Sequence, residues 1–220
     1  QRKNGWVIES AQHLFEAEVV FICAGAIQTP MLLQRSRISS LAGKSLHLHP
    51  TIKIVARFPD AINSLNMGVP VHQVKEFSPR ISLGCSISSP AYLSVAMLDH
   101  REGSRLVASH WQQMAIYYAM VTDGNGCVRN VPFYSDPLVT YKLGEKGYKN
   151  ILDGLETLAE CLFAAGAIEL YPSVHPIETV RSMLDIKRLR YELTAERLNL
   201  MTIHLFSSCP MGENKNICVT

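Results

Sequence analysis

The sequence has little charge, no excess of one sign and no long hydrophobic run. Charged residues make up 18% of the 220 residues and the formal net charge is +2, without a dense basic tract, so a nucleic-acid partner has no electrostatic support. The longest uninterrupted apolar run, VVFICAGA at residues 19–26, is far shorter than the ~20 residues that a membrane-spanning helix needs. Hydrophobic residues account for 47% of the chain, which argues against disorder and predicts a globular protein with a substantial core.

Cysteine pairs and a glycine-rich phosphate loop are also missing. No Cys-x-x-Cys pair occurs, so the sequence indicates neither a zinc knuckle nor a redox dithiol. We expect mostly reduced core thiols at positions 23, 85, 127, 161, 209 and 218. There is no Gly-x-Gly-x-x-Gly after a strand, the loop that holds a dinucleotide pyrophosphate at a helix N-terminus. The chain starts at Gln1 without a charged-then-apolar leader, so no targeting signal can be read.

An α/β segment is predicted near the N-terminus, in EAEVVFICAGAIQTPMLLQRS at residues 16–36. Its run of Val, Phe and Ile is typical of a strand buried on both faces of a parallel sheet. The small residues 24–26 end this strand and allow backbone or a ligand to approach closely, although they could equally serve only to pack a helix. Thr29 has the side chain of an N-cap and Pro30 suits a first helical position, so we expect the helix to begin there.

From about Leu46 the pattern changes to short alternating strands. TIKIVARF at residues 51–58 and MAIYYAMV at residues 114–121 are both predicted to be antiparallel strands, with a short helix near residues 91–98 between them. Asp-Gly and Asn-Gly steps follow the second strand and lead into another apolar run. This pattern predicts a hairpin with its turn at residues 123–126.

A longer helix is predicted over residues 151–163, because apolar side chains recur there at intervals of three and four. Gly166 can end this helix in a left-handed cap, and a strand is expected near Ile168. The charged stretch 185–198 predicts a solvated helical surface before a strand in NLMTIH. The predicted fold class is therefore α/β at the start of the chain, followed by an α+β part with an antiparallel sheet.

The stretch TIHLFSSCPMGENKN, residues 202–216, contains the candidate catalytic histidine, His204. A lone histidine beside an apolar strand is more often structural than catalytic. Cys209 nearby raises the possibility of a Cys–His nucleophile, but closeness in sequence does not establish hydrogen-bonding geometry, and the Pro-Met-Gly turn that follows is typical of a structural turn. From the residues alone, His204 is either a structural side chain or a base.

Three segments, in this order, resemble motifs of the glucose–methanol–choline family of flavin-dependent oxidoreductases. GAIQTPMLLQRS at residues 25–36 is similar to Gly-Ala-x-x-Ser/Thr-Pro-x-Leu-Leu-x-x-Ser, although the family continues Ser-Gly-Ile-Gly where this chain has SRIS at 36–39. GKSLHLHPT at 43–51 resembles Gly-Arg-Asn-Leu-x-Asp-His-Pro, and its Leu-His-Pro form looks most like the long-chain alcohol oxidase branch. HLFSSCPMG at 204–212 resembles His-x-x-Gly-Thr-Cys-x-Met-Gly, with Ser207 in place of the first glycine.

The resemblance implies a chain in three parts and a bound FAD. Residues 1–45 would be the end of a Rossmann-like FAD-binding domain, residues 46–200 a substrate-binding domain, and residues 201–220 an active-site strand and turn that return to the FAD-binding domain. The family's glycine-rich loop would precede Gln1, and its second active-site His or Asn would follow Thr220. The chain is therefore expected to be an internal piece of a longer enzyme.

The activity that the resemblance implies is FAD-dependent oxidation of an alcohol, with His204 accepting the hydroxyl proton while a hydride passes to the flavin. A neutral imidazole suits this role because its unperturbed pKa lies near ~6.5. The substrate would be a small-molecule alcohol, and the Met, Tyr and Phe side chains between residues 46 and 200 favour a bulky or long-chain one. The electron acceptor stays open. Two alternatives are a family lyase without net redox and a non-catalytic binding domain derived from the family.

The resemblance also indicates further site residues. His49 belongs to the His-Pro motif that borders the active-site cavity in the family, and we expect it either to bind substrate or to hold a loop. His47 shares a strand face with His49, but two histidines without a nearby cysteine or carboxylate make a poor metal site, and no metal is predicted. The residues expected to contact the cofactor are Ala24, Gly25 and Ala26.

Overall fold

The computed structural model describes residues 5–219, which form two compact units. The first contains residues 5–46, 127–140 and 207–219, and the second contains residues 47–126 and 141–206. No helix within residues 5–219 combines the length and the apolar character that crossing a membrane requires.

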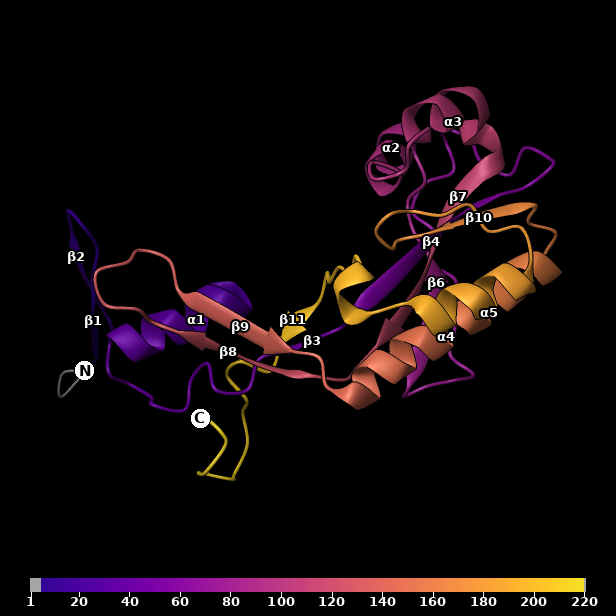
Figure 1. The fold of residues 1–220 in the computed structure, drawn as a ribbon. Helices are drawn as coiled ribbons and strands as arrows, with labels where there is room; N and C mark the ends of the chain where they lie inside the picture. Colours follow the sequence, from indigo (N-terminus) through magenta and orange to yellow (C-terminus); the bar gives the residue numbers. More distant parts are fainter. Residues whose placement is uncertain (1–4, 220) are drawn as a thin grey trace. The chain divides into compact units, whose positions relative to one another are not determined.

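The second unit is built on a five-stranded antiparallel sheet with strand order β10–β4–β7–β6–β5 (Figure 1). The strands are β4 (Thr51–Arg57), β5 (Gln73–Val74), β6 (Ile81–Cys85), β7 (Met114–Val121) and β10 (Glu169–Pro172). The antiparallel strands predicted at 51–58 and 114–121, and the strand predicted near Ile168, are confirmed. Because β4 and β6 occupy both edges of β7, β7 is a central strand of this sheet.

Helices pack on both faces of the sheet, and strand alternation decides which side chains each helix contacts. On one face, α4 (Glu145–Ala164) contacts β4, β6 and β7 and is flanked by α5 (Met183–Glu192) (Figure 1). Ile52 and Ile54 of β4 point to this face and are fully buried. On the other face, α2 (Pro90–Ala96) contacts β4 and β7 and packs against α3 (Gly103–His110), burying Val55 and Ile116. Two short 3-10 helices, η1 (Trp111–Gln113) and η2 (Ala195–Arg197), complete the unit's helices.

The long helix ends as the sequence predicts. Gly166 has φ +94°, a left-handed conformation that favours glycine. Its N–H donates to the carbonyl of Phe163 at 3.0 Å, and the N–H of Ala167 donates to the carbonyl of Leu162 at 3.0 Å. This pair of bonds is a Schellman motif, which satisfies carbonyls that the helix end would otherwise leave unpaired. The predicted short helix at 91–98 and the helical surface within 185–198 are also confirmed, as α2 and α5.

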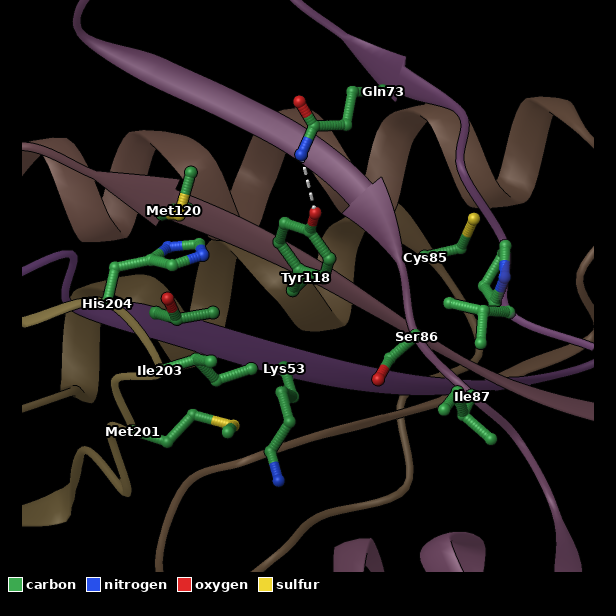
Figure 2. A pocket seen from close by; sticks show the side chains of 13 residues that line it. Lys53, Gln73, Cys85, Ser86, Ile87, Tyr118, Met120, Met201, Ile203 and His204 are labelled. Carbon is green, nitrogen blue, oxygen red and sulfur yellow. Dashed lines mark hydrogen bonds between the residues drawn. The ribbon is translucent and has the colours of Figure 1, made fainter.

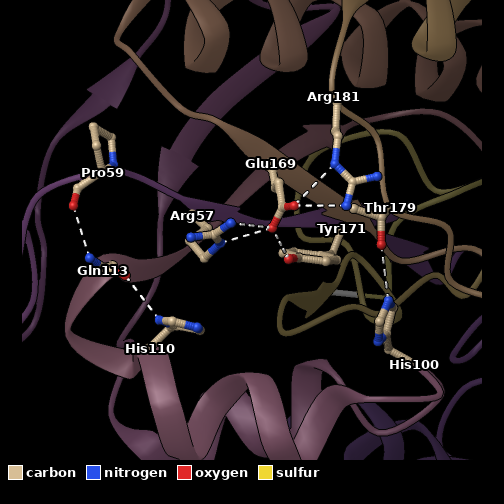
Figure 3. Close-up of polar contacts among 9 residues, drawn as sticks. All are labelled: Arg57, Pro59, His100, His110, Gln113, Glu169, Tyr171, Thr179 and Arg181. Carbon is tan, nitrogen blue, oxygen red and sulfur yellow. Dashed lines mark hydrogen bonds and ion pairs between the residues drawn. The ribbon is translucent and has the colours of Figure 1, made fainter.

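A carboxylate on β10 ties several elements of this unit together (Figure 3). Glu169 is nearly buried and accepts hydrogen bonds from Arg57 at 2.7 and 2.8 Å, from Arg181 at 2.9 and 3.1 Å, and from the Tyr171 hydroxyl at 2.5 Å. Burial alone would raise the pKa of Glu169, but these donors lower it below its usual value. Burial and the hydrogen bond to Glu169 raise the pKa of Tyr171 to about 12. The network therefore holds an ionised carboxylate at the sheet edge.

The first unit does not contain the buried strand predicted within residues 16–26, so that prediction is wrong. Its strands β1 (Trp6–Glu9) and β2 (Leu14–Ala17) form a two-stranded antiparallel hairpin, and residues 19–24 lie outside any strand. Val19 is 66% exposed and Phe21 86% exposed. A strand buried on both faces needs paired neighbours and covering helices, and the described residues supply neither to this segment.

The helix that follows begins earlier than predicted. α1 spans Gly25–Arg35, so Pro30 lies inside the helix rather than at its first position, and Thr29 is not its N-cap. A proline within a helix leaves the carbonyl four residues before it without its usual donor. Here that carbonyl belongs to Ala26, and the hydroxyl of buried Ser208 donates to it at 2.6 Å. This contact replaces the missing backbone bond and allows the helix to continue through Pro30.

The hairpin predicted at residues 123–126 is wrong. β7 ends at Val121 and pairs with β4 and β6, whereas β8 (Asn125–Arg129) pairs with β9 (Leu138–Lys142). The Asp-Gly step is instead held by the Tyr141 hydroxyl, which donates to the Asp123 carbonyl, and by Asn150 of α4, which donates to the Asp123 carboxylate. β7 has no free edge left for the next strand, so local turn chemistry could not pair them.

Two smaller predictions also need correction. The strand predicted in NLMTIH is reduced to a bridge between Met201 and Thr51, and pairing resumes only at β11 (Leu205–Phe206), which is antiparallel to β3 (His47–Leu48). All six cysteines are free, as expected, but none is buried in the core. Cys23 and Cys161 are exposed and the other four are partly buried, so the core location was wrong.

Candidate active site

The motif segments of the first unit are joined by a set of hydrogen bonds. The Gln34 side chain of α1 donates to the carbonyls of Ala42 and Val128, each at 2.8 Å. Gly43 donates its N–H to the carbonyl of Ser208 at 2.7 Å and accepts from the N–H of Val128 at 2.8 Å. Gly43 has φ +84°, and a Cβ there would lie 2.2 Å from the Val128 oxygen, so no other residue fits this close approach. The three segments that carry the family resemblance thus contribute residues to one hydrogen-bonded cluster.

Two departures from the family motifs fall at positions with positive φ. Arg37 stands where the family has glycine after α1 and has φ 54°, and the N–H of Ile38 donates to the Leu33 carbonyl in the same capping pattern as at the end of α4. Ser207 stands where the family has glycine in the last motif and has φ 63°. The backbone therefore keeps the left-handed turns that glycine favours, at a cost of about 1 kcal/mol at each non-glycine residue.

In the second unit, His204 lies against His49. The two Nδ1 atoms are 3.1 Å apart, and the rings meet edge to face with centroids 5.1 Å apart. One Nδ1 must carry the proton and the other the lone pair, because two donors or two acceptors cannot form this bond. Thr202 donates its hydroxyl to the His204 carbonyl at 3.1 Å, and Thr51 donates to the His49 carbonyl at 2.9 Å, so the backbone of each histidine is held locally.

The surroundings favour the neutral form of His49. Burial lowers the pKa of His49, and the nearby charge of His204 lowers it further. His49 also packs against Phe206 of β11, with ring centroids 4.7 Å apart. A neutral His49 has one ring nitrogen free to accept a hydrogen bond from His204.

His204 also lines a cavity of about 340 Å³ in this unit (Figure 2). That volume lies near the lower end of the range for small-molecule sites. The walls come from the loop before β5, from residues 85–87 at the end of β6, and from Met201, Ile203 and His204, and most of the lining is apolar. The cavity is therefore a small, largely apolar pocket with an imidazole at its edge.

The floor of the cavity is the part of the sheet that α2 and α3 leave uncovered. Strand alternation places Thr51 and Lys53 of β4, and Tyr118 and Met120 of β7, on the face opposite α4. Gly84 of β6 provides room for Tyr118, because a Cβ at Gly84 would lie 2.5 Å from its ring and hydroxyl. The Tyr118 hydroxyl accepts a hydrogen bond from Gln73 at 2.9 Å (Figure 2).

The structure brings His49 and His204 together in the second unit. His49 touches His204 and does not line the cavity, whereas Lys53, Gln73 and Tyr118 line it and were not singled out from the sequence. Their only local signal is the two-residue alternation of β4 and β7, which shows a shared face but not a cavity. Residues 24–26 form the N-terminal end of α1 in the first unit.

The cysteine alternative receives no support from the geometry. The hydrogen-bond partner of the His204 ring is His49. Burial raises the pKa of the Cys209 thiol, which disfavours the nucleophilic thiolate.

Comparison with known proteins supplies relatives for nearly the whole chain. No protein-family model matches it. The chain is 35% identical over 205 residues to an uncharacterised GMC-type oxidoreductase of Sinorhizobium fredii, covering 92% of this chain and 41% of that protein. It is 26% identical over 212 residues to an uncharacterised GMC-type oxidoreductase of Mycobacterium tuberculosis, covering 92% of this chain and 33% of that protein. It is 23% identical over 228 residues to a long-chain-alcohol oxidase of Arabidopsis thaliana, covering 91% of this chain and 30% of that protein.

These relatives show which proteins the sequence is similar to. The chain is a homologue of the GMC-type oxidoreductases along nearly its whole length, which confirms the resemblance carried by its three motifs. It spans less than half the length of each of these relatives.

Proposed function

We propose that the protein is an FAD-dependent oxidoreductase that oxidises an alcohol at the CH–OH carbon, with His204 as the base. The observation that carries the proposal is the position of His204, which lines the cavity with its ring and bonds His49 through Nδ1. The homology to GMC-type oxidoreductases supports the reaction class, and the match to a long-chain-alcohol oxidase supports an alcohol as substrate.

The histidine pair provides a route for the hydroxyl proton. When the Nδ1–H of His204 donates a hydrogen bond to His49, the Nε2 of His204 keeps a lone pair that can accept the proton of a substrate hydroxyl. His204 then becomes an imidazolium whose Nδ1–H still donates to neutral His49. A hydrogen bond from a charged donor is stronger than one from a neutral donor, so His49 stabilises the imidazolium form of His204 more than its neutral form. We propose that His49 acts in this way, as a positioning residue.

The N-terminal end of α1 fits a role in holding FAD. Ala24, the N-cap, makes no side-chain capping bond, so no side chain from that position occupies the first N–H groups of the helix. Gly25 has φ +75° and open space where a Cβ would stand. These features suit a polar or anionic group of the cofactor, and we propose that Ala24, Gly25 and Ala26 contact it. When bound, FAD supplies the hydride acceptor that no side chain of this protein can provide.

We propose that each of the three parts of the chain inferred from the resemblance has its own role in this function. Residues 1–45 would complete the FAD-binding domain of the whole protein, residues 46–200 would bind substrate, and residues 201–220 would present His204. The cavity is lined by residues 51–120 and 201–204, which agrees with a substrate site built from the last two parts.

The test is anaerobic stopped-flow reduction of the flavin in the complete, FAD-loaded protein. His204→Ala should keep its flavin and bind the alcohol with little change, but reduce the flavin about 10²–10⁴-fold more slowly, the usual contribution of a positioned acid–base group. His175→Ala is a matched control, because His175 is an imidazole of the same unit outside the cavity. A His204→Ala protein that reduces its flavin at the wild-type rate would overturn the proposal, as would turnover of an alcohol without flavin reduction, which a lyase would show.

A further inference from the structure

The cavity contains a positive charge that has no partner among the described residues. Lys53 lies in the middle of β4, and Ser173 holds its backbone: the Lys53 N–H donates to Ser173 Oγ at 3.0 Å and the Lys53 carbonyl accepts from the Ser173 N–H at 2.8 Å. Within residues 5–219, its ammonium group makes neither an ion pair nor a hydrogen bond. Arg57 on the same strand, in contrast, is paired with Glu169.

The surroundings of Lys53 are unfavourable for an isolated ammonium group. The cavity lining includes the apolar side chains of Val69, Ile87, Met201 and Ile203 and no Asp or Glu. Figure 2 shows Lys53 together with Ile87, Met201 and Ile203. Burial without a compensating group lowers the pKa of Lys53. A partly desolvated cation of this kind gains most from an anionic hydrogen-bond acceptor that enters the cavity with a ligand.

We infer that Lys53 binds a carboxylate of the substrate, so that the alcohol accepted by this site is a hydroxy carboxylic acid with an apolar spacer. This inference rests on the proposed function, since it assigns the second end of the molecule whose hydroxyl His204 deprotonates. The cavity then recognises three features: the hydroxyl by His204, the spacer by the apolar walls, and the carboxylate by Lys53.

His204 and Lys53 lie at different places in the cavity lining (Figure 2). Thr51 is bridged to Met201, which brings the segment carrying His204 to the sheet. Lys53 lies two residues further along β4, a distance of about 7 Å at the usual strand rise. Because His204 and Lys53 are carried by different segments of the lining, the proposed substrate is an acid whose hydroxyl and carboxylate are separated by an apolar spacer.

A carboxylate fits the site better than a phosphate group. Phosphate sites in proteins combine several donors, typically arginine forks or a series of backbone N–H groups. The cavity lining includes no arginine and a single lysine, and its volume is about 340 Å³. One ammonium group matches the single charge of a carboxylate.

The first experiment measures binding separately from turnover. In the complete, FAD-loaded protein, calorimetry with octanoate, which has no hydroxyl to oxidise, should show binding that Lys53→Met weakens about 10- to 100-fold, the range of a hydrogen bond to a charged group. Lys53→Arg should retain most of the binding. Lys187→Met removes an exposed lysine of α5 outside the cavity and is the matched control. Failure of octanoate to bind wild-type protein, or equal binding by Lys53→Met and wild type, would overturn the assignment.

The second experiment compares ω-hydroxyoctanoate with octanol as substrates. Wild-type enzyme should prefer the acid, and in Lys53→Met the ratio of kcat/KM for the acid to kcat/KM for octanol should fall about 10- to 100-fold. An octyl phosphate with a terminal hydroxyl tests the other anion, and a preference for it over the acid would contradict the choice of carboxylate. If wild-type enzyme binds octanoate through Lys53 but oxidises neither alcohol, the proposed oxidation fails while the carboxylate site stands, so the two failures are distinguishable.

Discussion

Replacing His49 by phenylalanine tests how the histidine pair works. Phenylalanine keeps a flat ring beside Phe206 but removes the nitrogen that bonds His204 at 3.1 Å. A neutral side-chain hydrogen bond contributes about 1 kcal/mol net, whereas one to a charged group contributes roughly 1.5–3 kcal/mol. Because His204 becomes charged only as the reaction proceeds, we expect flavin reduction to slow by about 10- to 100-fold.

The measurement is the limiting rate of anaerobic flavin reduction and its dependence on alcohol concentration, in the complete, FAD-loaded protein. A positioning role lowers the limiting rate and changes the apparent substrate affinity little. His47→Phe is the matched control, because His47 also lies beside Phe206, with ring centroids 6.0 Å apart, whereas the ring that bonds His204 is that of His49. The control should reduce its flavin at nearly the wild-type rate.

The pH dependence gives a second signature of the pair. Burial and the His204 charge lower the pKa of His49, so neutral His49 accepts the bond at neutral pH and loses this ability as the pH falls through its lowered pKa. The corresponding loss of rate at acid pH should be absent from His49→Phe. Unchanged reduction with an unchanged pH profile would refute the reasoning. A weaker apparent substrate affinity at an unchanged limiting rate would instead identify His49 as a substrate-binding residue.

Three further predictions concern packing and stability. Gly84→Ala places a methyl group 2.5 Å from Tyr118, so the Tyr118 ring must shift into the cavity that it lines. We expect the KM for alcohols to rise roughly tenfold in steady-state kinetics, and an unchanged KM would show that Tyr118 does not border the substrate site. Glu169→Gln should lower the free energy of unfolding in urea by about 2 kcal/mol at pH 7, because the charge that pairs with Arg57 is lost. Since folding lowers the pKa of Glu169, the stability difference should be fully present above the usual glutamate pKa and should vanish as the pH falls through the lowered pKa. A difference that does not change with pH would contradict this prediction. Arg37→Gly should raise the free energy of unfolding by about 1 kcal/mol, since its φ of 54° favours glycine, and equal or lower stability in urea would show that the arginine is not strained.

The sequence by itself determined the elements whose signals are local. β4 and β7 follow from apolar alternation, and α4 follows from apolar spacing with a capping glycine at position 166. Each of these patterns reports a property of consecutive residues. The motifs also indicated the similarity to GMC-type oxidoreductases, because their residue order is read directly from the chain.

Tertiary structure decided the features that depend on distant partners. α1 extends through Pro30 because Ser208, 182 residues away from Ala26, donates to the carbonyl that the proline leaves free. The Asp-Gly and Asn-Gly steps form no hairpin with β7 because both edges of that strand are already paired. No local pattern reports whether an edge or a carbonyl is occupied by a residue far along the chain.

The candidate site depends on the fold in the same way. His49 and His204 are 155 residues apart, and only the pairing of β3 with β11 brings their ring nitrogens within hydrogen-bonding distance. In the sequence, nothing distinguishes Lys53 from other lysines of β-strands. The fold reveals the cavity that Lys53 lines, because α2 and α3 cover only one part of this sheet face. Hydrogen bonding and burial act over a few ångströms in space, so residues far apart in sequence can form a site that no short stretch of the chain encodes.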